Sequence, residues 1–376
     1  MQRPIRIGMV GGGAGAFIGN VHRIALRMDG QYQLVAAALS SNRERALASA
    51  VELYIDPERS YADYREMARA EALRDDGIEV VAIVTPNHLH APVATAFLEA
   101  GIHVICDKPL CLSAAEAKNL QAVAQRSGRL FMLTHNYSAY PLIRHARELV
   151  GSGALGQLRT VHVDYAQGWL TEPLADEGWR GDPALAGAAG ALGDIATHAF
   201  QLARFVTGLR VEQLAAELTT FVPGRRLDDY VHAMLRFEHG VKGLLSASQV
   251  AAGVENALQL KISGSRASLA FDQQNPNELW FTPHGAPAQR LTRCGPGVGE
   301  AGASASRVPA GHPEGYLEAF ATLYRDFAEQ VRGFGLGEMR SSTVTPTLVD
   351  GVEGMRFIET VLRSDRAGNG WVSFVD

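Results

Sequence analysis

Residues 5–19 read IRIGMVGGGAGAFIG, and this stretch predicts the fold of the first part of the chain. The apolar run Ile5–Val10 is typical of a buried strand, and three glycines follow it directly. We expect a helix over Ile18–Met28, so the glycines form the turn between a strand and a helix. Such a turn brings backbone N–H groups and a helix N-terminus together, which favours the binding of a pyrophosphate.

Two registers of this turn fit the dinucleotide-binding fingerprint. In the first, the third small residue is Ala16; in the second it is Gly19, and residues 14–16 lengthen the loop. We favour the second, because the amphipathic helix begins near Ile18. The alternative is a glycine-rich surface turn, but the place after a first strand favours a dinucleotide site. The residues that we expect at the cofactor in this turn are Gly11, Gly13, Ala16, Phe17 and Ile18.

Outward from the turn, short apolar strands alternate with helices as far as residue 134. The expected strands are Leu34–Leu39, Ile78–Val84, Ile102–Cys106 and Leu130–Thr134, and the expected helices are Arg43–Val51, Tyr61–Leu73, Pro92–Ala100 and 114–126 after the cap Ser113. Strands that are apolar throughout indicate a parallel sheet with helices on both faces. Residues 1–137 are therefore predicted to be an α/β Rossmann dinucleotide-binding domain.

The pattern changes after residue 137, where longer strands partly alternate apolar and polar residues. The expected strands are Leu158–Tyr165, Val211–Phe221, Val231–Phe237, Val241–Ser248 and Leu258–Ile262, and the expected helices are Tyr140–Val150, Asp194–Phe205, Tyr316–Val331 and Leu348–Leu362. Residues 138–376 are predicted to be an α+β domain with a large, mostly antiparallel, open-faced sheet. The segment Gly295–Gly311 reads as a flexible surface loop, either a linker or a lid.

Composition excludes several classes of protein. The 376 residues include 35 Lys and Arg against 40 Asp and Glu, so the net charge of −5 gives no footprint for nucleic acid or anionic membranes. No apolar run is long enough to span a membrane, and residues 1–13 do not resemble a signal peptide. Three cysteines form no disulfide framework or zinc-ligand spacing, which favours the cytoplasm and no metal.

The end of the second strand bears on the choice of cofactor. It reads Leu39-Ser-Ser-Asn-Arg43, without the acid that would hold the adenosine ribose of NAD. Hydroxyls and a guanidinium suit a 2′-phosphate, so Ser40, Ser41 and Arg43 favour NADP over NAD. The alternative is that Arg43 is a solvated residue of the next helix.

Two motifs stand at the carboxyl ends of later strands, where ligands bind in open α/β sheets. They read TPNHLH over 85–90 and DKP over 107–109. With the strand start AGIHV over 100–104, they resemble the glucose–fructose oxidoreductase, inositol dehydrogenase and rhizopine catabolism family (Gfo/Idh/MocA), whose hallmark is Glu-Lys-Pro. Asp107 in place of Glu keeps the charge and shortens the reach. The residues expected beside the cofactor here are Thr85, Pro86, Asn87, His90, Asp107, Lys108 and Asn136.

The resemblance extends to a second signature, GALGDIATH over 190–198. Asp194 and His198 stand four residues apart, so on an α-helix they share a face, which we expect to point to the crevice between the domains. The alternative is that Asp194 is an N-cap and His198 packs in the core. The expected substrate-binding residues are Lys108, Tyr137, Trp169, Trp179, Arg180, Asp194 and His198, with His312 as a further candidate.

The resemblance implies an NAD(P)-dependent oxidoreductase that acts on a secondary hydroxyl of a sugar or cyclitol. Histidine suits proton transfer near neutral pH, so His198 is a candidate base, while Lys108 stabilises a developing alkoxide and Asp194 orients the substrate. The family draws either His198 or Lys108 as the proton carrier, and both stay open. A cofactor that is recycled without release, and a non-enzymatic cofactor sensor or transcriptional co-regulator of the same fold, are alternatives.

Other residues have plainer interpretations. His88 and His90 lack the further ligands of a metal site, His103 and Cys106 lie in a strand core, and His22 is either close to the cofactor or packed in its helix. An open sheet face is costly in water, so we expect a homodimer or homotetramer through the second domain.

Overall fold

The computed structural model describes residues 3–173, 178–338 and 343–374. The chain forms two compact units. Unit 1 consists of Met1–Asn136 and Leu317–Val352, and unit 2 consists of Tyr137–Tyr316 and Glu353–Asp376. The division of binding tasks between domains 1–137 and 138–376 stays a prediction.

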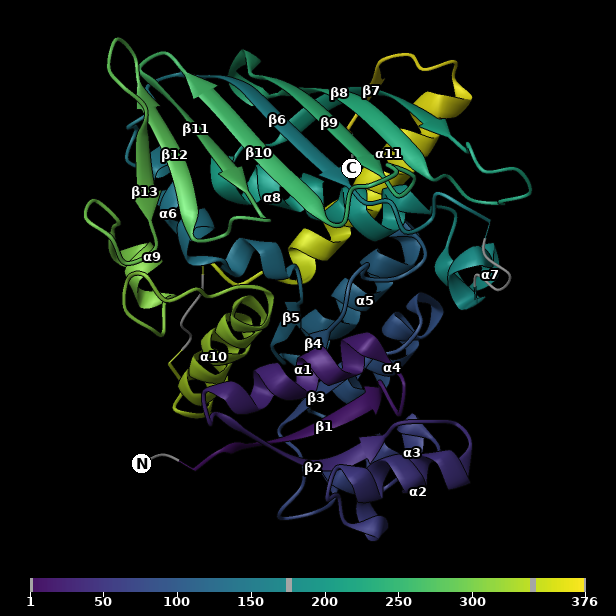
Figure 1. Ribbon diagram of the computed structural model, residues 1–376. Coiled ribbons are helices and arrows are strands. Elements are labelled where there is room, and N and C mark those ends of the chain that lie inside the picture. Colours follow the sequence, from purple (N-terminus) through teal and green to yellow (C-terminus); the bar gives the residue numbers. More distant parts are fainter. Residues whose placement is uncertain (1–2, 174–177, 339–342, 375–376) are drawn as a thin grey trace. The chain divides into compact units, whose positions relative to one another are not determined.

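Unit 1 is built on a parallel sheet, as the run of apolar strands predicts. Its strand order is β2-β1-β3-β4-β5, and Figure 1 shows the strands beside one another. The bounds are β1 Ile5–Gly11, β2 Tyr32–Ala38, β3 Val80–Val84, β4 His103–Cys106 and β5 Phe131–Leu133. The order reverses between β1 and β3, so a topological switch point lies at their carboxyl ends, which is where ligands bind in open α/β sheets.

Several helices of unit 1 begin at side-chain caps that the sequence supplies. Ser113 accepts a hydrogen bond from the backbone N–H of Glu116, and Asn42 from that of Arg45. The predicted helix 61–73 begins later, because Asp63 caps the N–H groups of residues 65 and 66. The bounds are α1 Phe17–Met28, α2 Arg43–Glu52, α3 Tyr64–Ala72, α4 His90–Glu99, α5 Ala114–Ser127 and α10 Tyr316–Gly335.

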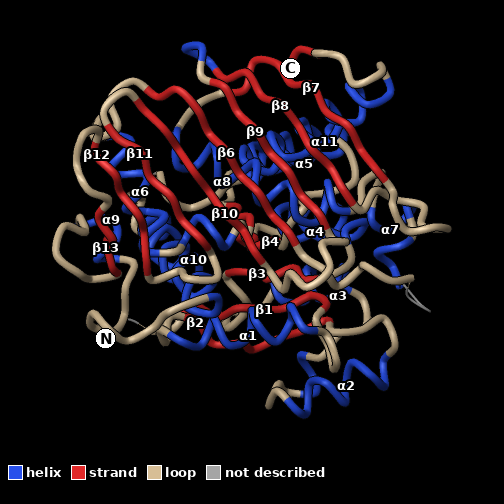
Figure 2. Tube along the Cα trace, turned by 45° about the horizontal axis from the view of Figure 1, so that its top comes forward, coloured by secondary structure: helices blue, strands red, loops and turns tan. Residues whose placement is uncertain are grey.

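Unit 2 contains a nine-stranded sheet of order β13-β12-β11-β10-β6-β9-β8-β7-β14, which Figure 2 shows as an array of strands. Every neighbouring pair is antiparallel except β6 and β9, which run parallel. The bounds are β6 Leu158–Ala166, β7 Val211–Thr219, β8 Tyr230–Phe237, β9 Lys242–Ser248, β10 Ala257–Gly264, β11 Ala267–Asp272, β12 Glu278–Pro283, β13 Gln289–Thr292 and β14 Val372–Ser373. The predicted fold class is confirmed, whereas β11–β14 were not predicted.

Several helices accompany the sheet of unit 2. They are α6 Pro141–Gly151, α7 Pro183–Ala186, α8 Thr197–Thr207, α9 Glu300–Ser304 and α11 Leu348–Arg366, and α8 contacts β6 and β9. The predicted flexible segment 295–311 contains helix α9, which packs against α6, and its Gly299 N–H donates to His145 Nδ1 at 3.1 Å. The interpretation of this whole segment as a flexible loop is therefore wrong.

None of the described helices has the length and apolar character that crossing a membrane would need.

One buried histidine of unit 1 makes stability depend on pH. Burial lowers the pKa of His103 to about 4, and its Nδ1 accepts a hydrogen bond from the backbone N–H of Leu130. The unfolded chain, with a histidine pKa of about 6.5, therefore binds a proton that the folded chain excludes between pH 6.5 and 4. The contribution of the neutral ring is present above pH 6.5 and is lost as the pH falls.

We predict that the difference in free energy of unfolding between wild type and His103→Asn changes by about 2 kcal/mol between pH 7 and pH 5. Asparagine keeps an acceptor and does not titrate, so wild type loses stability relative to the variant as the pH falls. Urea unfolding at both pH values measures it, with the exposed His284→Asn as control. A difference that does not change with pH would contradict the prediction.

Candidate functional site

The glycine turn of unit 1 holds β1 and α1 in close contact. A Cβ on Gly19 would lie 2.5 Å from the Cα of Gly12, so the two backbones meet where no side chain fits. The buried Arg23 donates to the carbonyl of Gly12. Helix α1 begins at Phe17, and Gly19 in its first turn has the packing role that the longer register requires of the third glycine.

The loop after β2 presents short polar side chains to solvent. Ser41, Asn42 and Arg43 are exposed. Asn42 caps α2, and its N–H is 3.1 Å from Ser40 Oγ. Arg43 is the first residue of α2, so its guanidinium stands at a helix N-terminus. The loop therefore has the donors that NADP binding needs, and its role stays a prediction.

The ends of β3 and β4 are tied together by a buried histidine. His90 Nδ1 lies 2.7 Å from the carbonyl oxygen of Pro109, and Nε2 lies 2.9 Å from that of Thr85. Burial lowers the pKa of His90, while Asp107 and the two carbonyls act in the opposite direction. The imidazole of His90 thus holds the two predicted motifs next to each other. This structural task does not require His90 to contact a cofactor, and such a contact stays a prediction.

Asp107 and Lys108 follow β4, and the carboxylate of Asp107 is fixed from two sides. Asp107 Oδ1 accepts hydrogen bonds from Thr134 Oγ1 at 2.7 Å and from the N–H of Lys108 at 2.9 Å. The Lys108–Pro109 peptide is cis. Lys108 is partly exposed, and it stands at the carboxyl edge of the sheet near the buried His135.

Buried polar atoms without protein partners show that this edge suits a ligand. Thr85 Oγ1 and Asn136 Nδ2 are buried and have no hydrogen-bond partner among the described residues. Such atoms cost free energy unless a ligand or water pairs with them. They follow β3 and β5 at the carboxyl ends of the sheet, so they fit the polar groups of a dinucleotide that binds over the glycine turn.

His22, His135 and Cys106 of unit 1 are buried. Burial lowers the pKa of His22 and of His135 to about 4, and it raises that of the Cys106 thiol well above its usual value, so the two rings are neutral and the thiol is unreactive. His22 Nδ1 lies 2.8 Å from the hydroxyl of Tyr324. His22 therefore packs between α1 and α10.

In unit 2, His198 lies in a cluster of aromatic rings. Its ring centroid is 4.9 Å from that of Tyr137 and 6.3 Å from that of Tyr165. The two tyrosine hydroxyl oxygens are 2.6 Å apart. The structure thus brings the predicted residues Tyr137 and His198 together, and it adds Tyr165, which the sequence analysis did not single out.

A network of hydrogen-bonded side chains extends from the two tyrosines. Tyr165 donates to Asn256 Oδ1 at 2.9 Å, so the single proton of Tyr165 is used and Tyr137 donates to Tyr165. Gln167 donates to Asn256 Oδ1 at 2.7 Å and accepts from Trp169 Nε1 at 3.0 Å. Each hydrogen bond polarises the next, so the network fixes the direction of several hydroxyl and amide groups.

Asp194 lies in a π-helical turn, Leu192–Ala196, and not in the predicted α-helix. Ala196 is the N-cap of α8, so the alternative that Asp194 caps this helix is wrong. Asp194 Oδ2 accepts a hydrogen bond from Gln249 Nε2 at 2.8 Å. Burial is the main cause that raises the pKa of Tyr165, Tyr137 adds to it, and the Asp194 carboxylate makes a smaller contribution in the same direction. Asp194 and His198 therefore both lie near Tyr165.

Other predicted substrate residues have contacts elsewhere. The guanidinium of Arg180 lies 4.5 Å from the ring centroid of Trp179, next to residues outside the described part of the chain. His312 is exposed, and its carbonyl accepts from the buried Arg293. The roles of Trp179, Arg180 and His312 in substrate binding stay predictions.

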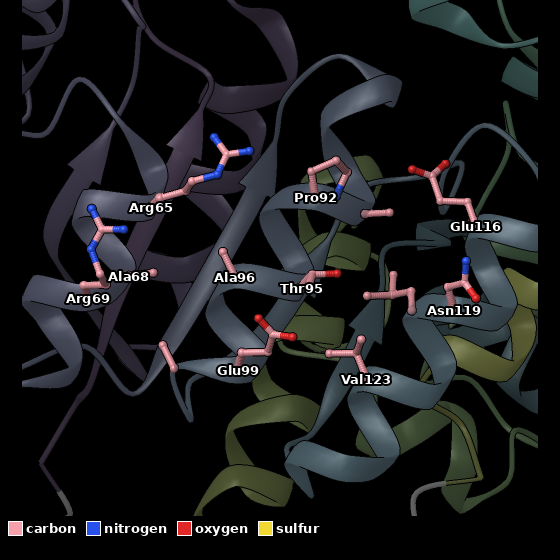
Figure 3. A pocket seen from close by; sticks show the side chains of 13 residues that line it. Arg65, Ala68, Arg69, Pro92, Thr95, Ala96, Glu99, Glu116, Asn119 and Val123 are labelled. Carbon is pink, nitrogen blue, oxygen red and sulfur yellow. The ribbon is translucent and has the colours of Figure 1, made fainter.

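Two grooves lie away from these residues. Figure 3 shows the groove of unit 1, about 740 Å³, between α3, α4 and α5, with Arg65 and Arg69 on one wall and Glu99 on another. A second, of about 500 Å³, lies in unit 2 beside Phe221 and Tyr230. The described lining of neither groove includes a predicted site residue.

Comparison with known families agrees with the geometry. Residues 5–135 match the model of an oxidoreductase family with an NAD-binding Rossmann fold, and residues 143–270 match the Gfo/Idh/MocA C-terminal domain. The chain belongs to the Gfo/Idh/MocA family. It is therefore an NAD-binding oxidoreductase, and the prediction of an enzyme is confirmed.

Solved structures and a curated relative extend this comparison. An oxidoreductase from Sinorhizobium meliloti is 48% identical, with a TM-score of 0.90 over 99% of this chain and 100% of that one. An inositol dehydrogenase homolog from Azotobacter vinelandii, solved with NAD+, is 37% identical, with a TM-score of 0.94 over 99% and 98%. It has also been solved with NADH and myo-inositol. Levoglucosan dehydrogenase of Pseudarthrobacter phenanthrenivorans is 31% identical over 74% of this chain and 76% of its own length.

We predict that Thr85→Val weakens NAD(P)H binding two- to tenfold and leaves the stability of unit 1 almost unchanged. The hydroxyl has no partner among the described protein residues, so its loss removes about 0.5–1.5 kcal/mol of binding only. Cofactor fluorescence titration and thermal unfolding measure the two effects. Thr95→Val in the groove of Figure 3 is the matched control. Equal affinities of the two variants would contradict the prediction.

Proposed function

We propose that the protein transfers a hydride between a nicotinamide cofactor and a secondary hydroxyl carbon of a sugar or cyclitol. The observation that carries this proposal is the network of hydrogen-bonded side chains beside His198. Directed hydroxyl and amide groups of Tyr137, Tyr165, Asn256 and Gln167 can match a substrate with several hydroxyls. The relative solved with myo-inositol and the levoglucosan dehydrogenase support the same substrate class.

The chemistry of the proposed reaction divides into two transfers. Oxidation removes a hydride from carbon and a proton from the hydroxyl oxygen, and the nicotinamide accepts the hydride when it is bound. The protein must accept the proton. Either His198 or Lys108 does so, and the other group stabilises the charge on the oxygen. Asp194 orients the substrate hydroxyl.

We predict that Lys108→Met and His198→Gln each lower kcat/KM about 10²–10⁴-fold on a responsive polyol, because each removes a group that handles the proton or the oxygen charge. Absorbance of reduced nicotinamide measures turnover, and the Kd for cofactor shows whether binding survives. Lys118→Met, on the exposed side of α5, is the control. Wild-type turnover in both site variants would remove the proposed site, and cofactor binding without turnover in wild type would favour a sensor.

We further propose that NADP is preferred over NAD. The support is the loop after β2, where Ser40, Ser41 and Arg43 offer donors to a 2′-phosphate and residues 39–43 include no carboxylate. A relative has been solved with NAD+ and with NADH, so the proposed preference for NADP would distinguish this chain from that relative.

We predict that Arg43→Ala lowers kcat/KM with NADP about tenfold and changes that with NAD less than twofold, because an exposed charge-assisted contact contributes about 1–2 kcal/mol. Initial rates with both cofactors measure this ratio. Arg45→Ala, also exposed on α2, is the control. A wild type that prefers NAD would overturn the proposed preference.

We also propose that the open face of the sheet in unit 2 forms a homodimer or homotetramer interface. Met234, Leu244 and His162 are exposed and stand side by side on β8, β9 and β6. Met234 and Leu244 are 46% and 50% exposed, which is unusual for strand residues of this size. A two-fold axis through such a row pairs the patch with itself.

We predict that Leu244→Lys lowers the molar mass in size-exclusion light scattering to that of the monomer, because a charge would be buried in the interface. Leu73→Lys, which is 88% exposed on unit 1, should leave the mass unchanged. A wild type that is monomeric at micromolar concentration would end this proposal.

Three free thiols, two of them buried, support a reducing compartment, and we propose the cytoplasm.

A further inference from the structure

Gln249 is a buried amide that the sequence motifs do not include. It follows β9 directly, its side chain is 3% exposed, and its Nε2 donates to Asp194 Oδ2 at 2.8 Å. A buried side chain with one amide aimed at a carboxylate restricts how that carboxylate can turn. The question is therefore what holds Gln249 itself.

The backbone of Gln249 is fixed on both sides. Its N–H donates to the carbonyl of Asp229 at 2.9 Å, and its carbonyl accepts from the N–H of Leu170 at 3.0 Å. Asp229 is fully buried and is held by the N–H groups of Phe221 and Val222 and by Arg225 Nη1 at 2.9 Å. The amide of Gln249 thus stands on a rigid part of the sheet edge.

Asp229, which holds the backbone of Gln249, is preceded by Asp228, and Asp228 holds the turn that carries Asp194. Asp228 accepts from the N–H of Gly190 at 2.6 Å and from that of Leu192 at 2.7 Å. The carbonyl of Asp228 accepts from the N–H of Ala191 at 2.9 Å. A Cβ on Gly190 would lie 2.0 Å from this carbonyl oxygen, so only glycine permits the contact. Asp228 and Asp229 therefore fix both partners of the hydrogen bond between Gln249 and Asp194.

We propose that Gln249 is a positioning residue that sets the orientation of the Asp194 carboxylate toward the substrate hydroxyl. This inference rests on the proposed function, because it assigns Gln249 a task through Asp194. The amide supplies an N–H donor, which favours the carboxylate form of its partner and selects one rotamer. An acceptor of the same size in its place would repel Asp194.

The variants Gln249→Ala and Gln249→Glu test this assignment. Loss of the amide in the first variant should lower kcat/KM for the polyol about 10- to 100-fold, because a misplaced orienting group costs that much. The Kd for NAD(P)H should stay within twofold. Gln125→Glu, on the exposed side of α5, is the control for the added charge.

The pH profile separates positioning from a structural role. In Gln249→Glu two carboxylates face each other, so one must bind a proton for the contact to form. We expect its kcat/KM, relative to wild type, to rise at least tenfold as the pH falls from 8 to 5.5. The other charged or titratable groups that the structure describes around the pair include His198, Tyr165, Asp228 and the ion-paired Asp229 and Arg225, and these are common to both proteins. A loss that does not depend on pH would overturn the inference.

A double-mutant cycle distinguishes the failure of this inference from the failure of the proposed function. If Gln249 acts through Asp194, Gln249→Ala should have less than a twofold effect in an Asp194→Asn background. A full additional loss there would refute the positioning role while the function stands. If Asp194→Asn itself turns over the polyol like wild type, the role proposed for Asp194 fails, and the role of Gln249 fails with it.

Discussion

The contact between Gly12 and Gly19 is the constraint on which the cofactor half of the molecule depends. It lets the start of α1 lie against the end of β1, so that backbone N–H groups collect at the switch point of the sheet. The motifs after β3 and β4 then need only be held at the same edge. His90 does so by placing its two ring nitrogens against the carbonyls of Thr85 and Pro109.

The two faces of the sheet in unit 2 carry different kinds of side chain. Alternation along β6 turns Tyr165 inward and His162 outward, so one strand contributes both to the network beside His198 and to the exposed face. On the inner side, the network is arranged by hydrogen bonds among Tyr137, Tyr165 and Asn256. The outer side carries the exposed row of Met234, Leu244 and His162.

Local patterns were enough to predict much of this structure. The apolar runs of unit 1 fixed five parallel strands, and the Ser113 cap marked the start of α5, because these signals need only neighbouring residues. Strands β11–β13 were missed because their residues alternate with polar and turn residues. They join the sheet only through successive pairing, β11 with β10, β12 with β11 and β13 with β12. The partners of the site residues were missed for a related reason: Gln249 is 55 positions from Asp194, and no local spacing connects the two. Inward alternation along β6 was the one available signal for Tyr165.

The π-helical turn at Leu192–Ala196 has a consequence for the orientation of Asp194. Such a turn corresponds to one residue inserted into an α-helix, and each residue of an α-helix rotates the following side chain by about 100°. Deletion of a single codon between Gly190 and Ala196 would straighten the helix, and the acidic side chain would then turn away from Tyr165. The length of this turn therefore sets the direction in which the carboxylate at position 194 points.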